Sequence, residues 1–336
     1  MTRPRVLVID DSAFARTVLT KLMQASGLIE VVGTATDGLE GLVRIGELDP
    51  DVVTLDLTMP GIDGIGLLRA LQGRSRPRVI VVSTSTIDTD LGAEALLLGA
   101  IDLISKPTVL ADERLQEIGT ELVAKVVAAA ESYRVRPSLP SVRGSRSAKR
   151  VALIMIGTST GGPQALTQLL AALPATLAVP IAIVLHIPAG YTEALANRLD
   201  VGSSLTVVEA KDGMPLQAGV AVIARGGQHL FIERDGLVLR ARLSALPGCA
   251  YTPSVDELFS SGATAVAAGA LGIVLTGMGD DGLAGARAIA AAGGALLTQS
   301  AASCVVYGMP RCVDEAAIGA MSLSIEDMAE EILRRV

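Results

Sequence analysis

The fold of the larger part of this chain is decided by residues 151–163, VALIMIGTSTGGP. Six apolar residues in a row, 151–156, are typical of a buried strand in a parallel sheet. A glycine-rich turn follows, and Pro163 then suits the first turn of a helix whose apolar positions continue to residue 170. The stretch therefore predicts a strand, a sharp turn and a helix, which is the repeating unit of an α/β fold.

The turn in this stretch has the spacing of a nucleophile elbow, with Ser159 between Gly157 and Gly161. Such a turn lifts a serine hydroxyl above the edge of the sheet, and the glycines let a substrate approach the backbone. The following helix directs unpaired N–H groups at any oxyanion that forms there. A glycine-rich turn that only binds an anion is the alternative. A phosphate-binding P-loop is disfavoured because no lysine follows the glycines.

Length and composition set the broad class. The chain has 336 residues, of which 50% are hydrophobic and none is tryptophan, so it can form two domains with aliphatic cores. The net charge of −7 gives no reason to expect a nucleic-acid partner. No signal peptide or membrane-spanning run is apparent, so we expect a cytoplasmic protein without membrane insertion. Cys249, Cys304 and Cys312 have no metal-ligand spacing, and we expect buried free thiols in a reducing compartment.

Residues 5–107 alternate between strand and helix patterns, which predicts βαβ units and a five-stranded parallel sheet. Asp10 and Asp11 end the first strand, Asp56 ends the third, and Lys106 ends the fifth. The carboxyl ends of parallel strands meet at one edge of the sheet, so we expect the three carboxylates to converge. Converging carboxylates repel unless a cation lies among them, and oxygen ligands of this kind suit Mg²⁺.

This segment resembles a response-regulator receiver domain over its whole length. The resemblance implies that Asp56 is the phosphoacceptor, that the other two aspartates hold Mg²⁺, and that Lys106 contacts the phosphoryl group. The switch hydroxyl of the family corresponds to Ser83 or Thr84, of which we favour Ser83. The pair Lys106-Pro107 resembles a Lys-Pro pair of the family whose peptide bond is usually cis.

A helical stripe at 111–131 is expected to close the receiver, and the segment after it is rich in Pro, Ser, Gly and basic residues. That composition is typical of a solvated linker. No helix-turn-helix pattern with a basic recognition helix follows it, which argues against a DNA-binding regulator. We therefore predict a receiver domain at 1–131, a linker at 132–150 and a catalytic domain at 151–336.

The second domain carries further candidate residues near the ends of predicted strands. Residues 179–188 have a buried strand pattern, and His186 lies at its end, where an imidazole could take the serine proton. The other histidine, His229, is expected to begin a strand and to lie away from the reaction. Asp280 and Asp281 follow another strand pattern, where one carboxylate could orient the histidine while the other caps a helix. Spacing alone does not decide between the two.

The order serine, histidine, aspartate differs from that of α/β-hydrolases, chymotrypsin and subtilisin. Four motifs instead resemble the catalytic domain of chemotaxis receptor methylesterases: GTSTGGP, LHIPAGYTEALANRL, TGMGDDGLAG and ASCVVYGMP, within 151–335. The resemblance implies that Ser159 is the nucleophile, His186 the general base and Asp281 the orienting acid. It also implies that the backbone N–H groups of Thr160 and Met278 form the oxyanion hole.

The sequence departs from this family at Thr158, where alanine is usual, at Leu185, where glutamine is frequent, and at Asp280, where asparagine is common. The prediction is an α/β protein, with a five-stranded receiver domain followed by a larger, doubly wound, mostly parallel esterase domain. The resemblance implies a phosphorylation-activated serine esterase that hydrolyses glutamate methyl esters, and deamidates glutamines, on methyl-accepting chemoreceptors. A chemotaxis histidine kinase would be the phosphodonor, with Mg²⁺ in the receiver and no cofactor in the catalytic domain. The alternative is a phosphorylation-switched signalling adaptor with an inactive esterase-like domain.

Overall fold

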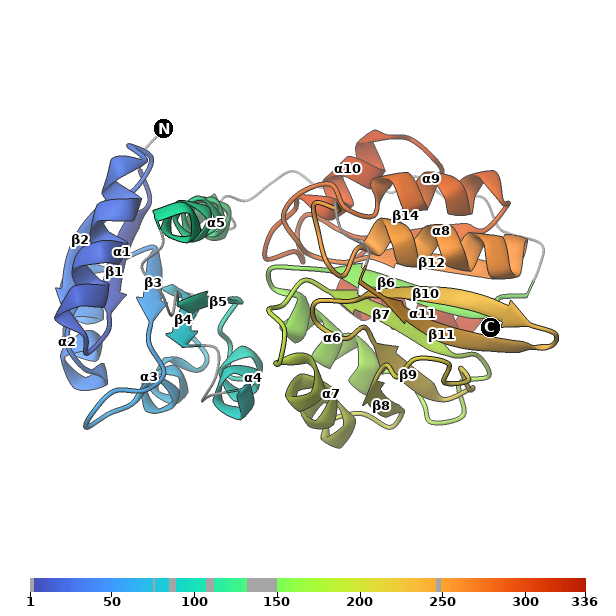
Figure 1. The fold of residues 1–336 in the computed structure, drawn as a ribbon, viewed down its shortest axis with the longest axis horizontal. Coiled ribbons are helices and arrows are strands. Elements are labelled where there is room, and N and C mark those ends of the chain that lie inside the picture. Colours follow the sequence, from blue (N-terminus) through green and yellow to red (C-terminus); the bar gives the residue numbers. More distant parts are fainter. Residues whose placement is uncertain (1–2, 75, 85–88, 107–111, 132–149, 246–248) are drawn as a thin grey trace. The chain divides into compact units, whose positions relative to one another are not determined.

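The structure is a computed structural model of the chain, in which residues 3–74, 76–84, 89–106, 112–131, 150–245 and 249–336 are described. The chain divides into two compact units, residues 1–134 and residues 135–336, and each is described by itself (Figure 1). Within the described ranges, no helix combines the length and the apolar character needed to cross a membrane.

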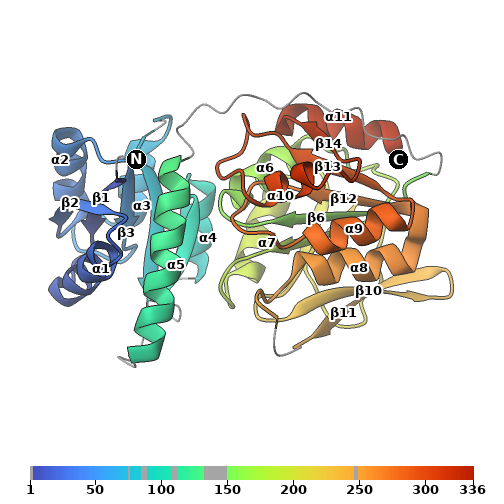
Figure 2. The same cartoon turned by 90° about the horizontal axis from the view of Figure 1, so that it is seen from above.

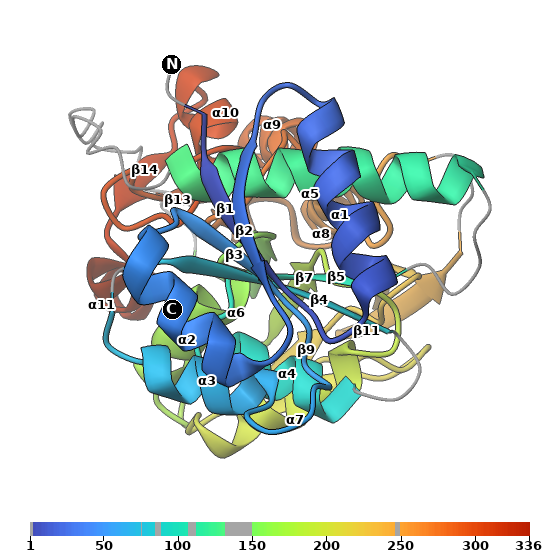
Figure 3. The ribbon, with the colours of Figure 1, turned by 90° about the vertical axis from the view of Figure 1, so that its left-hand side faces the viewer.

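The first unit is built on a five-stranded sheet in the order β2-β1-β3-β4-β5, and all neighbouring strands are parallel. Its strands are β1 (Arg5–Ile9), β2 (Glu30–Ala35), β3 (Val52–Leu55), β4 (Arg78–Thr84) and β5 (Asp102–Lys106). Its helices are α1 (Ala13–Ala25), α2 (Gly38–Leu48), α3 (Gly64–Leu71), α4 (Thr89–Leu97) and α5 (Asp112–Glu131). In Figure 3, α1 and α5 cover one face of this sheet, and α2, α3 and α4 cover the other. This confirms the predicted receiver architecture.

The helix α5 packs as the helical stripe predicted. Leu122 and Val126 are fully buried on its inner face. Between them in sequence, Lys125 reaches the buried Asp102 on β5, with Nζ 2.8 Å from Oδ1. The pKa of Lys125 is raised: burial opposes the charge, but the carboxylates of Asp102 and Glu121 outweigh it. Removing either Lys125 or Asp102 would leave an uncompensated buried charge and destabilise the domain. The ion pair therefore favours the position of α5 against β5.

The second unit contains a seven-stranded sheet in the order β14-β13-β12-β6-β7-β9-β8, again parallel throughout. Its strands are β6 (Leu153–Thr158), β7 (Ile181–Leu185), β8 (Thr206–Glu209), β9 (Val220–Ile223), β12 (Ala270–Val274), β13 (Ala295–Gln299) and β14 (Met321–Leu323). A separate antiparallel pair, β10 (His229–Asp235) and β11 (Val238–Ser244), packs against α8 (Val255–Val266). This confirms the larger, mostly parallel α/β domain, and His229 does begin a strand.

Helices cover both faces of the larger sheet. They are α6 (Gly162–Ala171), α7 (Thr192–Val201), α8, a short 3₁₀ turn η1 (Ala267–Gly269), α9 (Leu283–Ala291), α10 (Met309–Glu315) and α11 (Ile325–Arg335). In Figure 2, α6 and α11 lie on one side of the sheet, and α8 and α9 lie on the other with the β10–β11 pair. The strand β6 has β12 on one side and β7 on the other, so the strand order changes direction there. Ligands of open α/β sheets bind beyond the carboxyl ends of strands at such a switch point.

The cysteines correct one prediction. All three are free, but Cys249 is exposed, and Cys304 and Cys312 are only partly buried. The expectation of buried thiols was therefore wrong. Cys249 lies on the segment that leads into α8 rather than inside a strand or helix, so burial of apolar surface does not draw it inward.

Candidate active site

Three side chains from three adjacent strands form the candidate site. Ser159 follows β6, His186 follows β7, and Asp281 lies in the turn between β12 and α9. Because β12, β6 and β7 are neighbours in a parallel sheet, their carboxyl ends share one edge. The structure thus brings the predicted serine, histidine and aspartate to the same rim.

The elbow around Ser159 depends on glycine at two places. Gly161 has a φ of +79°, a left-handed conformation that side chains disfavour. Gly277 of the neighbouring turn packs directly against the nucleophile, since a Cβ there would lie 2.9 Å from Ser159 Cβ and 2.4 Å from Met309 Sδ. These contacts leave the serine only 8% exposed and fix its backbone above β6.

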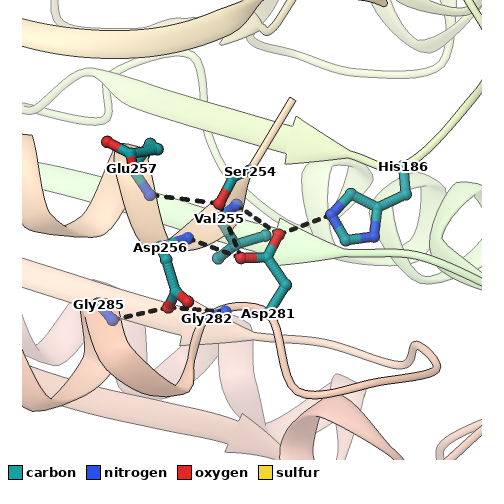
Figure 4. Close-up of polar contacts among 8 residues, drawn as sticks. All are labelled: His186, Ser254, Val255, Asp256, Glu257, Asp281, Gly282 and Gly285. Carbon is teal, nitrogen blue, oxygen red and sulfur yellow. Dashed lines mark hydrogen bonds and ion pairs between the residues drawn. The ribbon is translucent and has the colours of Figure 1, made fainter. Parts of the chain in front are cut away.

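The His186 ring donates its Nε2–H to Asp281 Oδ2 across 2.8 Å (Figure 4). Nδ1 is therefore the nitrogen available to take a proton from the serine, which reverses the use of the two nitrogens in chymotrypsin. Among the described contacts there is no hydrogen bond between Ser159 Oγ and the ring. Such contacts in a substrate-free enzyme often tighten only when substrate binds.

The Asp281 carboxylate is held at the N-terminus of α8. Oδ1 accepts the Ser254 hydroxyl at 2.8 Å and the Asp256 N–H at 3.0 Å, and Oδ2 accepts the Val255 N–H at 2.7 Å. Burial opposes ionisation of this carboxyl, but the hydrogen bonds from His186 and the two backbone N–H groups outweigh it, so its pKa is lowered. The group is thus a fixed, ionised acceptor for the histidine (Figure 4).

The prediction that Asp280 or Asp281 caps α9 was wrong. Asp280 is exposed, and its side chain makes no hydrogen bond among the described residues. The cap comes instead from Asp256, whose Oδ1 accepts the N–H groups of Gly282 at 2.9 Å and Gly285 at 2.7 Å. The spacing along α9 could not reveal this because Asp256 belongs to α8, which packs against α9.

Thr276 ties the elbow to the turn that carries Met278. Its carbonyl accepts the Ser159 N–H at 3.0 Å and the Thr158 hydroxyl at 2.8 Å. Its own hydroxyl donates to the Thr160 carbonyl at 2.9 Å. Within the described part of the chain, the Met278 N–H has no acceptor, so it can serve an oxyanion. Thr158, the departure from alanine, thus has a structural partner.

The motif ASCVVYGMP supports the same turn from behind. The Val306 N–H donates to the Thr276 hydroxyl at 2.9 Å, and the Val306 carbonyl accepts the Gly277 N–H at 3.0 Å. The buried Gln299 accepts the Thr276 N–H at 2.8 Å and donates to the Ser303 carbonyl at 2.8 Å. The motif therefore acts through the backbone of the turn.

Sequence reasoning missed three residues of this site. Ser254 and Asp256 bind or flank Asp281 as described, and the Tyr251 ring stacks on His186 with 4.7 Å between ring centroids. One signal was available, because Ser254-x-x-Glu257 has the spacing of a capping box and marks the start of α8. Nothing in the spacing pointed to Tyr251.

The receiver unit has its own acidic cluster at the predicted sheet edge. Carboxylate oxygens of Asp10, Asp11 and Asp56 lie within 4.8 Å of one another. Lys106 Nζ lies 2.6 Å from Asp10 Oδ2 and 2.7 Å from Asp56 Oδ2. Burial and the nearby Asp56 carboxylate raise the pKa of Asp10, although Lys106 and the Ser12 N–H oppose this shift. Hard oxygen ligands at this spacing fit Mg²⁺.

The switch positions are described only in part. Ser83 is buried, and its hydroxyl has no hydrogen-bond partner among the described residues. The side chain of Thr84 and the whole of Pro107 lie outside the described residues, and so does the predicted cis bond.

The fold and the two sites define a class: a receiver-like domain with an acidic cluster at its sheet edge, joined to an α/β domain with the side chains of a serine hydrolase. Residues 6–118 match the response regulator receiver domain, and residues 154–332 match the CheB methylesterase domain. The chain belongs to the CheB methylesterase family.

Full-length relatives agree with this assignment. The chain is 52% identical to a Myxococcus xanthus protein named protein-glutamate methylesterase/protein-glutamine glutaminase 5, covering 99% of this chain and 98% of the relative. The chain is also 41% identical to a Symbiobacterium thermophilum protein named protein-glutamate methylesterase/protein-glutamine glutaminase, covering 99% of this chain and 97% of the relative. The crystal structure of the Thermotoga maritima CheB methylesterase catalytic domain is 33% identical, with a TM-score of 0.55 over 56% of this chain and 100% of that chain.

Proposed function

We propose that this protein is a phosphorylation-activated serine esterase that hydrolyses glutamate γ-methyl esters, and deamidates glutamines, on chemoreceptor helices. The observation that carries the proposal is the hydrogen bond from His186 to Asp281 at the sheet edge where the elbow presents Ser159. Relatives named for both activities support the choice of substrate.

In the proposed reaction, Ser159 Oγ attacks the ester carbonyl while His186 Nδ1 takes the serine proton. Asp281 stabilises the imidazolium that forms, and the carbonyl oxygen becomes an oxyanion that accepts the backbone N–H groups of Thr160 and Met278. The intermediate collapses when the imidazolium gives its proton to the departing methanol. Water then attacks the acyl-enzyme with the same proton transfers, which releases glutamate and restores the serine.

The receiver is proposed to control this reaction through phosphorylation of Asp56 by a chemotaxis histidine kinase. Mg²⁺ held by Asp10, Asp11 and Asp56 would neutralise charge on the phosphoryl group during transfer. Lys106, already within 2.7 Å of Asp56, would contact a phosphoryl oxygen. Ser83 remains the favoured switch residue, and its buried hydroxyl, which has no hydrogen-bond partner among the described residues, is available for a phosphoryl oxygen.

The remaining elements of the proposal concern organisation and location. The receiver, linker and catalytic boundaries of 1–131, 132–150 and 151–336 are retained. A cytoplasmic location is proposed because the substrate helices and the kinase of this family act there. The hydrolysis is proposed to need no cofactor in the catalytic domain, because the serine, the histidine and the aspartate supply the nucleophile, the base and the stabilising charge.

Receptor membranes that carry labelled methyl groups test the proposal. The wild-type protein should release labelled methanol, and Ser159→Ala should reduce release by several orders of magnitude. Ser204→Ala is the matched control, because Ser204 is an exposed serine of the same domain. Release by Ser159→Ala at near wild-type rate would contradict the proposal. An inert wild-type protein that still bound receptors after phosphorylation would support the adaptor alternative.

A further inference from the structure

The Tyr251 ring lies flat against the ring of His186. Their centroids are 4.7 Å apart, and the planes differ by 4°. The tyrosine comes from the segment that leads into α8, whereas the histidine follows β7, so the contact joins distant parts of the chain. Tyr251 also lines a cavity of about 360 Å³ beside Asp281, together with Ser254 and Asp280.

The stack supplies a restraint that the hydrogen bond alone does not. The bond to Asp281 fixes one ring nitrogen, Nε2, but leaves the imidazole able to turn about that contact. Rotation would change the direction of Nδ1, which is the ring nitrogen left available to take the serine proton. A phenol face packed parallel to the imidazole blocks this rotation on one side. It also stabilises positive charge on the imidazole, since a cation over an aromatic face is attracted by the ring quadrupole.

The far end of the Tyr251 side chain lies close to Gly279. A Cβ on Gly279 would lie 2.5 Å from the tyrosine hydroxyl oxygen, so the hydroxyl sits directly over this glycine of the oxyanion turn. The hydroxyl makes no hydrogen bond within the described structure. Burial raises the pKa of Tyr251, and Asp280 and Asp281 raise it further, so the phenol stays neutral in the working range.

We propose that Tyr251 is a positioning residue of the hydrolytic reaction, whose ring holds the His186 imidazole in the plane that directs Nδ1 at Ser159. The ring carries this role, and the hydroxyl is dispensable. The inference rests on the proposed function, because it assigns a task within the same reaction.

Two variants separate ring from hydroxyl. Tyr251→Phe keeps the stacked face and should retain kcat within about twofold. Tyr251→Leu keeps apolar volume but loses the face, and kcat should fall roughly 5- to 30-fold with little change in KM. Both variants are measured by methanol release from labelled receptor membranes. Their urea midpoints show whether the fold is intact, and Tyr251→Trp, which restores an aromatic face, should recover activity in a folded protein.

A small fluorophosphonate probe gives a second readout that needs no receptor. Its rate of labelling of Ser159 reports serine activation, so it should fall in Tyr251→Leu by the same factor as kcat. An unchanged labelling rate with a raised KM for receptor would make Tyr251 a substrate contact and overturn the proposal. Equal losses in Tyr251→Phe and Tyr251→Leu would also overturn it. If the wild-type protein labels but releases no methanol, the proposed substrate fails while the role of Tyr251 is still tested.

Discussion

Replacement of Asp281 by asparagine is the sharpest test of how the catalytic acid works. The carboxylate accepts four hydrogen bonds: from His186 and Val255 at Oδ2, and from Ser254 and Asp256 at Oδ1. An amide has one oxygen and one NH₂ group, so it cannot accept at both positions. Each of its two orientations leaves a backbone N–H without an acceptor.

With the amide oxygen at the Oδ2 position, the Asp256 N–H is unpaired and the histidine keeps its tautomer. The loss in turnover is then the loss of negative charge beside the imidazolium, about 1.5–3 kcal/mol or roughly 10- to 150-fold. With the oxygen at the Oδ1 position, the Val255 N–H is unpaired and His186 must present Nε2 without its proton. The proton then occupies Nδ1 and the ring cannot act as a base. The loss is on the order of 10⁴, as when asparagine replaces the orienting aspartate of a serine protease.

We therefore expect Asp281→Asn to lower kcat by between about 10- and 10⁴-fold, and to lower the free energy of unfolding by about 1–3 kcal/mol for the unpaired N–H. Methanol release and urea unfolding measure the two effects. Asp280→Asn is the matched control, because the exposed Asp280 side chain makes no hydrogen bond among the described residues, and this change should have only a modest effect. A larger loss in Asp280→Asn than in Asp281→Asn would refute the assignment of the two carboxylates.

Three further predictions concern the oxyanion turn, acid stability and control. Thr276→Val removes the hydroxyl that is hydrogen-bonded to Thr160 and Val306, so kcat should fall about 10- to 100-fold at similar KM. Thr276→Ser keeps a hydroxyl and should retain kcat. Equal activity of the two variants would contradict a role for the hydroxyl. Because the pKa of Asp281 is lower in the folded protein than in the unfolded chain, its ionised carboxylate stabilises the fold at pH values above the unfolded pKa. This stabilisation is lost as the pH falls through the pKa of the folded protein. The difference in unfolding free energy between wild type and Asp281→Asn should thus narrow as the pH falls below about 4, as urea titrations at each pH would show. Asp56→Asn should abolish stimulation of methanol release by acetyl phosphate and Mg²⁺, and deletion of residues 1–140 should raise basal release. A deletion variant no faster than the unphosphorylated chain would contradict inhibition of the esterase by the unphosphorylated receiver.

Local patterns in the sequence were sufficient for the fold and for the residues at strand ends. The helix expected after Asp280 and Asp281 is α9, and Ser159, His186 and Asp281 all reach the expected rim. These predictions succeed because a strand pattern followed by glycine and a polar residue fixes both the element and its chemically active end. The same reasoning predicted that the aspartates of the receiver lie together, because the carboxyl ends of parallel strands share one edge of the sheet.

Contacts made between separate helices and loops could not be predicted in this way. The cap of α9 comes from Asp256 on another helix, and the stack on His186 comes from Tyr251 in an irregular segment. Both depend on how α8 packs beside α9, which no local period records. The predicted burial of Cys249 was wrong for a related reason, because hydrophobic character predicts burial only where the backbone is packed in a core.

The packing of α8 on α9 is also what makes the catalytic acid rigid. Asp281, which precedes α9, binds the N-terminus of α8, and Asp256, in the first turn of α8, binds the N-terminus of α9 (Figure 4). Each carboxylate thereby accepts hydrogen bonds from N–H groups at the start of the other helix, where these groups have no acceptor within that helix. The pKa values of the two carboxyls shift in opposite directions. Burial raises the pKa of Asp256, whereas at Asp281 the hydrogen bonds from His186 and the backbone N–H groups outweigh burial and lower the pKa. The N–H groups at the start of α8 thus stabilise negative charge on the carboxylate that bonds to the histidine, where the proposed reaction forms an imidazolium.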